Sequence, residues 1–464
     1  MEEKRTSQFG MKDKIGYMFG DFGNDFTFIL STVLMSIFYS DVMGVSPGLV
    51  GAVMMVARFV DAFTDVTMGQ IVDRSKPTKA GKFKPWILRM CGPVAISSLL
   101  IYGSWFKDMP MVFKVAYMFI TYILWGSFCY TGVNIPYGSM ASAITNNPQE
   151  RQSLSTFRTM GGMAAGMIIN VIVPMVIYKK VEVSGELVNI LDGGRCSIIA
   201  ALCSVGAVVC YLLCYNLCTE RVKVEQKTEK FELGKLFKNL ISNKSLIGIV
   251  LASICQLLVQ LTSQTMNTYI YTKVFNNPTA QSVAGVISMV PMLLVAGIIG
   301  KLTMKFGKKE LAVAGSIFGA IVFAFMFVIR TDSPWVFVAM YGISCIGLAI
   351  FAMICWAMIT DVIDDTEVRQ GVRSDGEIYS VYSFARKLGQ AAAAGVSGVL
   401  LTLIGYDGTL AVQTDAVKNG IYNISTLVPA IGFVLLAVVL QFLYPLNKKR
   451  VEENVKILAE KNLK

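Results

Sequence analysis

Long apolar runs are the feature that most constrains this chain. Of its 464 residues, 54% are hydrophobic and 16% are charged. The apolar residues gather between polar breaks in segments of roughly 20 residues, which is the length that a helix needs to cross a bilayer. Ordinary soluble domains do not have this composition. The sequence therefore predicts an all-α integral membrane protein that crosses the membrane many times.

The polar breaks divide the chain into twelve expected transmembrane helices. Ser46-Pro47 and Ser333-Pro334 are typical of a helix start, with serine as the N-cap and proline in the first turn. The expected spans begin near Ile15, Gly48, Trp86, Met111, Ser153, Cys196, Leu246, Ala280, Leu311, Pro334, Ile378 and Ile421.

The positive charges predict how the chain lies in the membrane. The chain has 42 Lys and Arg against 31 Asp and Glu, a net charge of +11. Most of the positive residues fall in the termini and in the even-numbered connections, so we expect both termini in the cytoplasm of a bacterial cell. Residues 1–14 are polar and lack the apolar core of a cleaved signal peptide. Because the charge excess indicates topology, no nucleic-acid partner is expected.

The charged segment 219–244 divides the chain near its middle. We expect a six-helix bundle over 1–218, a cytoplasmic linker over 219–244, a second six-helix bundle over 245–447 and a cytoplasmic tail over 448–464. Glycine and basic residues follow the second span at Gly69 and the eighth span at Gly300. Such paired turns are typical of a duplicated transporter, although any cytoplasmic loop can be rich in glycine and lysine.

The residues that are missing exclude several kinds of chemistry. The chain contains no histidine, which excludes histidine-based catalytic triads and histidine-ligated metals. Its 10 cysteines are scattered through apolar runs without metal-ligand spacing and are interpreted as small core residues. We therefore expect no enzyme and no bound cofactor.

Charged residues inside the expected first and second spans form the strongest candidate site. Asp21 and Asp25 lie in the first span, and Arg58, Asp61 and Asp65 lie in the second. Each such charge costs about 2.5–3.5 kcal/mol at the centre of a membrane helix. Carboxylates four residues apart share a helix face and repel each other unless a cation lies between them or one is protonated. We interpret Asp61 and Asp65 as a cation site, for sodium or for a proton; a structural ion pair with Arg58 is the alternative.

Hydroxyl and cationic side chains complete the candidate set. Thr64 and Thr131 offer hard oxygen ligands for sodium, or else bond their own backbone. Arg158 and Lys387 are isolated cations in the fifth and eleventh spans, suited to binding hydroxyls or a carboxylate. Aromatic residues, among them Trp356 and Tyr382, could stack on a sugar ring or serve only in packing.

Several motifs resemble the glycoside-pentoside-hexuronide cation symporters, a family within the major facilitator superfamily. The motifs cover both halves of the chain: Tyr17-Met-Phe-Gly-Asp-Phe-Gly-Asn-Asp25, Val56-Ala-Arg-Phe-Val-Asp-Ala-Phe-Thr-Asp65, Gly81-Lys-Phe-Lys-Pro-Trp86, Asn134-Ile-Pro-Tyr-Gly-Ser139 and Tyr379 to Lys387.

The resemblance implies a major facilitator fold and uptake of a sugar coupled to sodium or a proton by alternating access. It implies roles for matching residues: the sugar is bound by Asp25 and Arg158, with Lys387 close by, and the cation by Asp61, Asp65 and Thr131. We expect the chain to act as a monomer in the lipid bilayer, with a small sugar and a monovalent cation as its partners.

Three positions depart from the pattern of one branch of the family: two bear on the substrate, and the third, Thr64, leaves sodium or a proton open as the coupling ion. Members that transport melibiose have an aspartate and a tryptophan where this chain has Asn134 and Gly138, and an asparagine where it has Thr64. The chain is closer to the pentoside and hexuronide branches, and Asn134 joins the expected sugar site. Loss of a carboxylate near Arg158 also makes an acidic sugar, such as a uronate or a sulfonated sugar, an alternative substrate. An exporter, a facilitator and a sugar sensor also stay open.

Overall fold

The computed structural model describes residues 8–183, 185–222, 243–370 and 375–462. The chain separates into two compact units. The first comprises Met1–Lys230 with Asp407–Ala411, and the second comprises Phe231–Tyr406 and Val412–Lys464. Most of the expected linker, residues 223–242, lies outside the described residues, and the predicted domain boundaries stay predictions.

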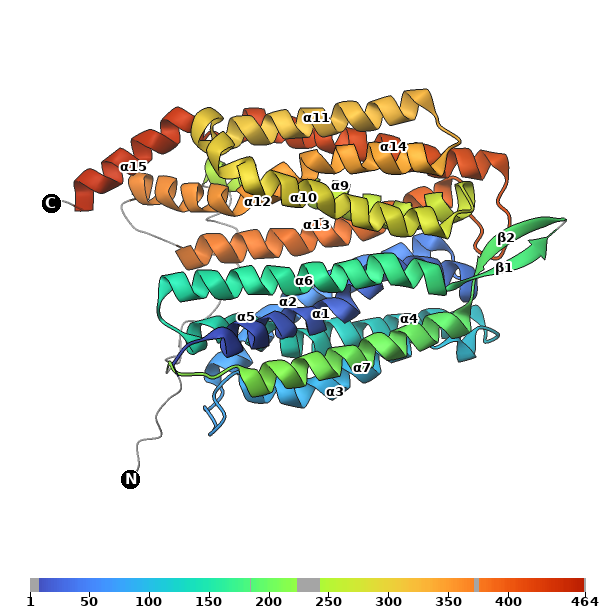
Figure 1. Cartoon of the computed structure of the whole chain (residues 1–464), viewed down its shortest axis with the longest axis horizontal. Coiled ribbons are helices and arrows are strands. Elements are labelled where there is room, and N and C mark those ends of the chain that lie inside the picture. The colour runs from blue at the N-terminus through green and yellow to red at the C-terminus, as the bar shows by residue number, and fades with distance from the viewer. Residues whose placement is uncertain (1–7, 184, 223–242, 371–374, 463–464) are drawn as a thin grey trace. The chain divides into compact units, whose positions relative to one another are not determined.

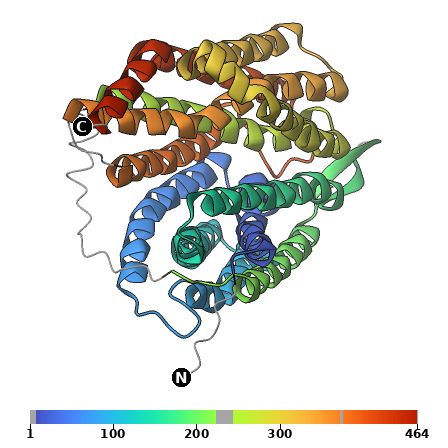
Figure 2. The ribbon, with the colours of Figure 1, turned by 60° about the vertical axis from the view of Figure 1, so that its left-hand side comes forward.

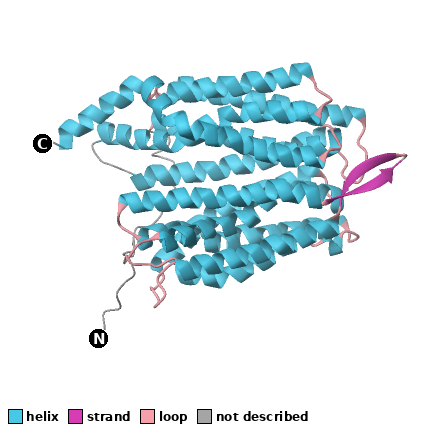
Figure 3. Cartoon of the chain, viewed as in Figure 1, coloured by secondary structure: helices cyan, strands magenta, loops and turns pink. Residues whose placement is uncertain are grey.

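The first unit is a bundle of long helices with one β-hairpin at its edge (Figures 1 and 3). A π-helical segment, Leu124–Tyr130, joins two of the helices into one continuous element. The helices are α1 (Met11–Ile37), α2 (Pro47–Arg74), α3 (Lys84–Ile101), α4 (Met111–Ile123), α5 (Thr131–Ile144), α6 (Pro148–Val176) and α7 (Gly193–Leu217).

The second unit is also a helical bundle and ends in a shorter polar helix (Figure 1). Helix α15 occupies most of the expected tail. The helices are α9 (Lys244–Tyr269), α10 (Pro278–Phe306), α11 (Lys308–Ile329), α12 (Pro334–Gln370), α13 (Asp375–Leu403), α14 (Asp415–Val438) and α15 (Lys448–Asn462).

Ten helical segments of the described chain are long and apolar enough to cross a membrane. The other two expected spans correspond to α2 and α13, which have 28 and 29 residues but are not among the ten. Helix α2 carries Arg58, Asp61 and Asp65, and α13 carries Lys387, which are charged residues that the sequence analysis singled out. The all-α membrane class is therefore confirmed, whereas the number of twelve spans is not confirmed by hydropathy.

The helix starts follow from local chemistry. Ser46 is the N-cap of α2 and Pro47 its first residue, as predicted, but the Ser46 side chain makes no capping hydrogen bond. Helix α6 begins at Pro148 rather than near Ser153, because the Asn147 side chain accepts a hydrogen bond from Gln149 N at 2.9 Å. This capped polar turn extends α6 beyond its apolar stretch.

A β-hairpin connects α6 to α7, which the sequence analysis did not anticipate. Strands β1 (Tyr178–Val183) and β2 (Glu186–Leu191) pair antiparallel (Figure 3). Asp192 follows the hairpin and caps α7. Backbone N–H groups, chiefly that of Arg195 at 3.1 Å, and the Lys179 ammonium at 3.1 Å lower the pKa of this carboxyl below its usual range.

The motif Gly81–Trp86 wraps around one carboxylate. Glu220 accepts hydrogen bonds from the backbone N–H groups of Lys82, Phe83 and Lys84, at 2.7, 2.9 and 2.7 Å. Gly81 has φ of +119°, a conformation that disfavours residues with a Cβ. The carboxylate thus satisfies N–H groups at the start of α3 and ties the end of the first unit to the loop between α2 and α3.

Glu220→Ala should lower the melting temperature of the purified protein. The substitution leaves three N–H donors without their charged acceptor, and the lost hydrogen bonds should reduce the free energy of unfolding by about 2 kcal/mol. Thermal unfolding followed by circular dichroism measures the change, with Glu182→Ala on the exposed face of the hairpin as the matched control. Equal melting temperatures of the two variants would contradict this role for Glu220.

Candidate substrate and cation sites

Helix α1 is the central element of the candidate site in the first unit. It packs against both α6 and α7 (Figure 2). Glycine residues permit the close approach: a methyl group at Gly23 would lie 3.1 Å from the Ala207 oxygen of α7, and Gly161 of α6 meets the Met18 backbone. The Asp21 and Asp25 side chains are therefore held within a tightly packed helix interface.

Asp21, Asp25 and Arg158, with Gly162, form what we call the carboxylate–arginine cluster. Arg158 Nε donates a hydrogen bond to Asp21 Oδ1 at 2.9 Å. A methyl group at position 162 would lie 2.6 Å from Asp25 Oδ2 and 3.1 Å from Asp21 Oδ2. Both carboxylates therefore point to the same place on α6, one turn beyond Arg158, and the missing side chain of Gly162 leaves room for them.

Aromatic rings position the Arg158 guanidinium. Its centre lies 5.3 Å from the ring centroid of Tyr137, and that ring stacks on Tyr17 at 4.6 Å. The Tyr137 hydroxyl donates to the Tyr17 backbone oxygen at 2.7 Å, which fixes the ring between α5 and α1. The Arg158 side chain is nevertheless 41% exposed. Because a charge facing hydrocarbon is costly, this exposure indicates that the guanidinium faces a polar space.

Asn134 joins the cluster through α1. Asn24 Nδ2 donates to Asn134 Oδ1 at 3.4 Å, and the Tyr211 hydroxyl donates to Asn24 Oδ1 at 2.8 Å. Asn24 is fully buried and immediately precedes Asp25. Asn134 is thus oriented by a chain of amide and hydroxyl groups that links α5, α1 and α7.

Arg58, Asp61, Asp65, Ser127 and Thr131 form a second group, called here the paired-aspartate cluster. Arg58 Nη1 lies 3.1 Å from Asp61 Oδ2, and both residues are buried. The Ser127 hydroxyl donates to Asp61 Oδ1 at 2.5 Å. The arginine that the sequence offered as a structural partner is therefore bonded to Asp61.

Asp65 lies one turn along α2 and has a different partner. The Thr131 hydroxyl donates to Asp65 Oδ1 at 2.7 Å and lies 3.1 Å from the Gly126 carbonyl oxygen. Gly126 and Ser127 belong to the π-helical segment Leu124–Tyr130, and such wide turns are frequent at functional sites. A methyl group at Gly126 would lie 3.3 Å from Asp61 Oδ1, so this segment faces both aspartates closely.

Thr64 is oriented differently from Thr131. Its hydroxyl donates to the Val60 and Asp61 backbone oxygens of its own helix, both at 3.2 Å. This is the backbone bonding that the sequence analysis left open for threonines in spans, and a role for Thr64 in cation binding stays a prediction.

The two clusters differ in the chemistry that they offer. Each contains two carboxylates and one guanidinium, so each carries one excess negative charge when its aspartates are ionised. The paired-aspartate cluster adds hydroxyl and carbonyl oxygens, which are the ligands of a hard monovalent cation. The carboxylate–arginine cluster adds amide and aromatic groups, which suit a hydroxylated ligand. Across the described residues, no group of three His, Cys, Asp or Glu has the arrangement of a metal centre.

Lys387, Tyr382 and Trp356 belong to the second unit. Tyr382 and Trp356 meet edge to face at 5.3 Å, and the Arg386 guanidinium lies 5.8 Å from the Trp356 centroid. The Tyr382 hydroxyl is 3.0 Å from Cys355 Sγ. Lys387 is half-buried on α13. Their predicted roles in sugar binding stay predictions.

Sequence reasoning named Asp21 in the candidate site but did not predict that it pairs with Arg158. The assignment of Asp25 to the sugar stays a prediction, and two contributors to the first unit's clusters were missed. Sequence reasoning gave no weight to Gly162 or Ser127, because a glycine or a serine in an apolar helix is ordinary. A glycine pair on a helix that also carries a lone arginine is the signal that could have identified Gly162.

Comparisons with known proteins decide the family. The family model described as MFS/sugar transport protein matches residues 16–448. The chain belongs to this family. The symporter YjmB of Bacillus subtilis, itself uncharacterized, is 32% identical over 99% of this chain and 97% of its own length. The glucuronide carrier protein homolog of Escherichia coli is 30% identical over 97% of this chain and 96% of its own.

A solved structure supports the same architecture. A point mutant of the nucleoside transporter NupG superposes with a TM-score of 0.66 at 16% identity, covering 93% of this chain and 100% of NupG. At this identity the likeness shows the fold alone. This MFS/sugar transport protein is therefore a multi-pass membrane transporter of the major facilitator type and not an enzyme, and its expected ligand is a small sugar. The family resemblance drawn from the motifs is confirmed.

Gly162→Ala should weaken substrate binding without unfolding the protein. The added methyl group would overlap Asp25 Oδ2 and push both carboxylates away from Arg158. Isothermal titration of the purified variant with the transported sugar should show an affinity at least tenfold lower. Gly138→Ala is the matched control, because nothing lies within 4 Å of the place that its methyl group would take. Equal affinities for the two variants would contradict the crowding argument.

Proposed function

We propose that the protein is a symporter that imports a sugar together with a sodium ion or a proton by alternating access. The observation that carries the proposal is the paired-aspartate cluster. Two aspartates one turn apart lie inside a helix of the bundle, and one guanidinium pairs with Asp61. A cation bound beside the two carboxylates would relieve their mutual repulsion.

The coupling cation would bind beside Asp65. Its carboxylate accepts the Thr131 hydroxyl at 2.7 Å, and the Gly126 carbonyl lies 3.1 Å from that hydroxyl. A sodium ion would gain oxygen ligands from all three groups, whereas a proton would need only the carboxylate. Since the chain has no histidine, aspartate is the natural proton carrier in this region.

The sugar would bind at the carboxylate–arginine cluster, with Asp25, Arg158 and Asn134 as hydrogen-bonding groups. The motif resemblance implies a further role for Lys387, and Tyr382 and Trp356 stay candidates for stacking on a sugar ring. Binding of the cation and of the sugar would raise each other's affinity, typically by about 1–3 kcal/mol. We infer a monomer in the cytoplasmic membrane with both termini in the cytoplasm.

An acidic sugar is the second candidate within this function. The Arg158 guanidinium is partly exposed, and it could form a forked pair with the carboxylate or sulfonate of a ligand. Asn134, which is neutral, stands where the members of the family that transport melibiose have an aspartate. A relative at 30% identity is named as a glucuronide carrier homolog, which favours testing uronates first.

The direction of transport separates symport from the alternatives. In proteoliposomes, an imposed sodium or proton gradient should drive accumulation of labelled sugar above equilibrium. A facilitator would only equilibrate the sugar, and an exporter would respond to a gradient of the opposite sense. Glucuronate, a sulfonated hexose and neutral glycosides, each offered as a competitor, would identify the substrate class. A sensor would show no flux.

Asp65→Asn should abolish gradient-driven accumulation. The variant loses the charge that would attract the cation but keeps an oxygen that can accept the Thr131 hydroxyl. Uptake against a concentration gradient in proteoliposomes is the measurement. Asp73→Asn, near the end of the same helix, is the matched control and should accumulate sugar normally. Undiminished accumulation by Asp65→Asn would remove Asp65 from the cation site.

Arg158→Ala should lower sugar affinity by about 30-fold or more, as expected for loss of one partner of a hydrogen-bonded charge pair. Arg158→Lys keeps the charge but not the forked geometry and should retain part of the affinity for an acidic sugar. Equilibrium binding measures both variants, with Arg89→Ala on the exposed face of α3 as control. Wild-type affinity in Arg158→Ala would place the sugar elsewhere.

A further inference from the structure

An apolar groove runs along the outer face of the second unit between α11 and α14. Its volume is about 620 Å³, and Gln441, at one end, is the polar residue in its lining. Its alanines Ala320 and Ala437 are buried, while larger apolar side chains of the lining, such as Ile321 and Phe442, are exposed. The lining residues are Val313, Ile317, Ala320, Ile321, Ala324, Val434, Ala437, Val438, Gln441 and Phe442.

The length of the groove matches one leaflet of a bilayer. From Val313 to Ala324 the chain advances about 16 Å along α11 at 1.5 Å per residue. This is close to half of a hydrocarbon core of roughly 30 Å. The groove spans the central part of α11, from five residues after its start at Lys308 to five residues before its end at Ile329. Its length therefore accommodates much of a single acyl chain whose headgroup lies toward the start of the helix.

Lys309 lies at the polar end of the groove. Its ammonium donates to the backbone oxygens of Gln441 at 2.9 Å and of Tyr444 at 2.7 Å. An ammonium has three N–H donors, so one is left for a further acceptor. Because Gln441 also lines the groove, this charge stands where a lipid headgroup would begin.

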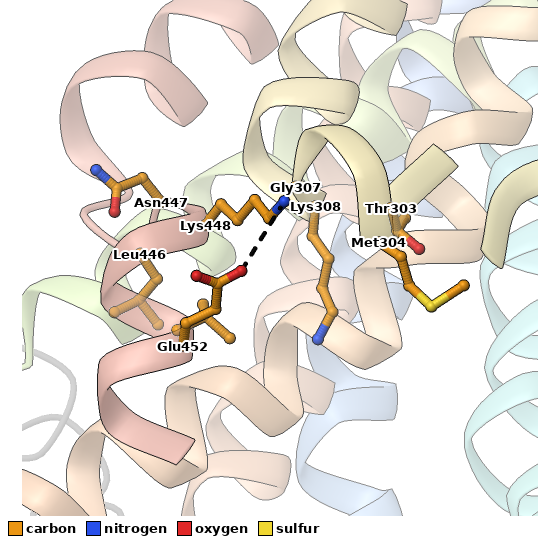
Figure 4. A pocket seen from close by; sticks show the side chains of 9 residues that line it. Thr303, Met304, Gly307, Lys308, Leu446, Asn447, Lys448 and Glu452 are labelled. Atoms are coloured by element: carbon orange, nitrogen blue, oxygen red, sulfur yellow. Dashed lines mark ion pairs between the residues drawn. The ribbon is translucent and has the colours of Figure 1, made fainter. Parts of the chain in front are cut away.

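The neighbouring lysines are already paired. Lys308 Nζ is 2.6 Å from Asp361 Oδ1, and Lys448 Nζ is 3.9 Å from Glu452 Oε1 in a separate hollow of about 270 Å³ beside α15 (Figure 4). Lys309 makes no salt bridge within the described part of the chain, although the Glu310 carboxylate is next to it in sequence and accepts the Lys448 N–H at 3.3 Å. Lys309 is therefore the cation best placed to bind an anionic group.

We propose that this groove is a binding site for an anionic phospholipid, with one acyl chain between α11 and α14 and the phosphate on Lys309. The apolar lining suits the acyl chain, and the ammonium at its end is complementary to the phosphate. Ile321 and Phe442, which border the groove, are 62% and 78% exposed in the isolated chain. By the predicted orientation, the lipid belongs to the cytoplasmic leaflet.

Native mass spectrometry of the full-length purified protein tests the site. The probes are phosphatidylglycerol and phosphatidylcholine with identical acyl chains. The wild-type protein should retain phosphatidylglycerol with the higher affinity. Lys309→Gln should lower that affinity by about fivefold and leave phosphatidylcholine unchanged. Lys301→Gln, an exposed lysine near the end of α10, is the matched charge control.

Filling the groove tests the acyl-chain half of the site. Ala324→Phe should reduce retention of phosphatidylglycerol, and Ala324→Val should reduce it less. Val328→Phe lies on the same helix outside the groove and should retain the lipid as the wild type does. Circular dichroism melting checks that each variant is folded.

Equal retention of the two lipids by the wild type, or wild-type retention by both Lys309→Gln and Ala324→Phe, would overturn the proposal. So would a monomer–dimer shift in Ala324→Phe with lipid retention unchanged, because a second copy would then occupy the groove.

Discussion

The cost of placing charge in a hydrocarbon environment governs the organisation of the first unit. Arg58 and Asp61 are buried almost completely, and each persists because the other lies 3.1 Å away. Ser127 and the aromatic rings around Arg58 supply the remaining contacts, since its guanidinium lies 5.1 Å from Phe28 and 5.7 Å from Tyr122. Asp65, one turn along α2, instead accepts the Thr131 hydroxyl, so the two neighbouring aspartates have different surroundings.

The sequence predicted the features that depend on hydropathy and on the cost of charge. The apolar runs predicted the membrane class. The free-energy cost of a charge within a membrane helix singled out Asp25, Asp61, Asp65 and Arg158 from the sequence alone. Pairing could not be predicted in the same way, because Asp21 and Asp25 share a helix face and are chemically identical. Only the position of α6 decides that Arg158 bonds to Asp21. The hairpin and the capped start of α6 likewise depend on short-range polar contacts that hydropathy does not report.

The same physical rule explains why α2 and α13 are not among the ten apolar segments. A helix that carries charged residues is less apolar than one that only crosses the bilayer, so hydropathy predicts a span least well where charges gather. By contrast, α11 and α14 are highly apolar, and their outer faces are shaped by alternating small and large residues. The described chain thus combines polar clusters within the first unit with an apolar groove on the second.

The π-helical segment has a consequence for how the two clusters communicate. It ends at Tyr130, and α5 starts at Thr131. Thr131, Asn134 and Tyr137 are spaced by three residues and share one edge of that helix. Thr131 bonds Asp65, Asn134 bonds Asn24, and Tyr137 lies beneath Arg158. One edge of α5 therefore contacts residues of both clusters, so the position of this helix sets the geometry of both.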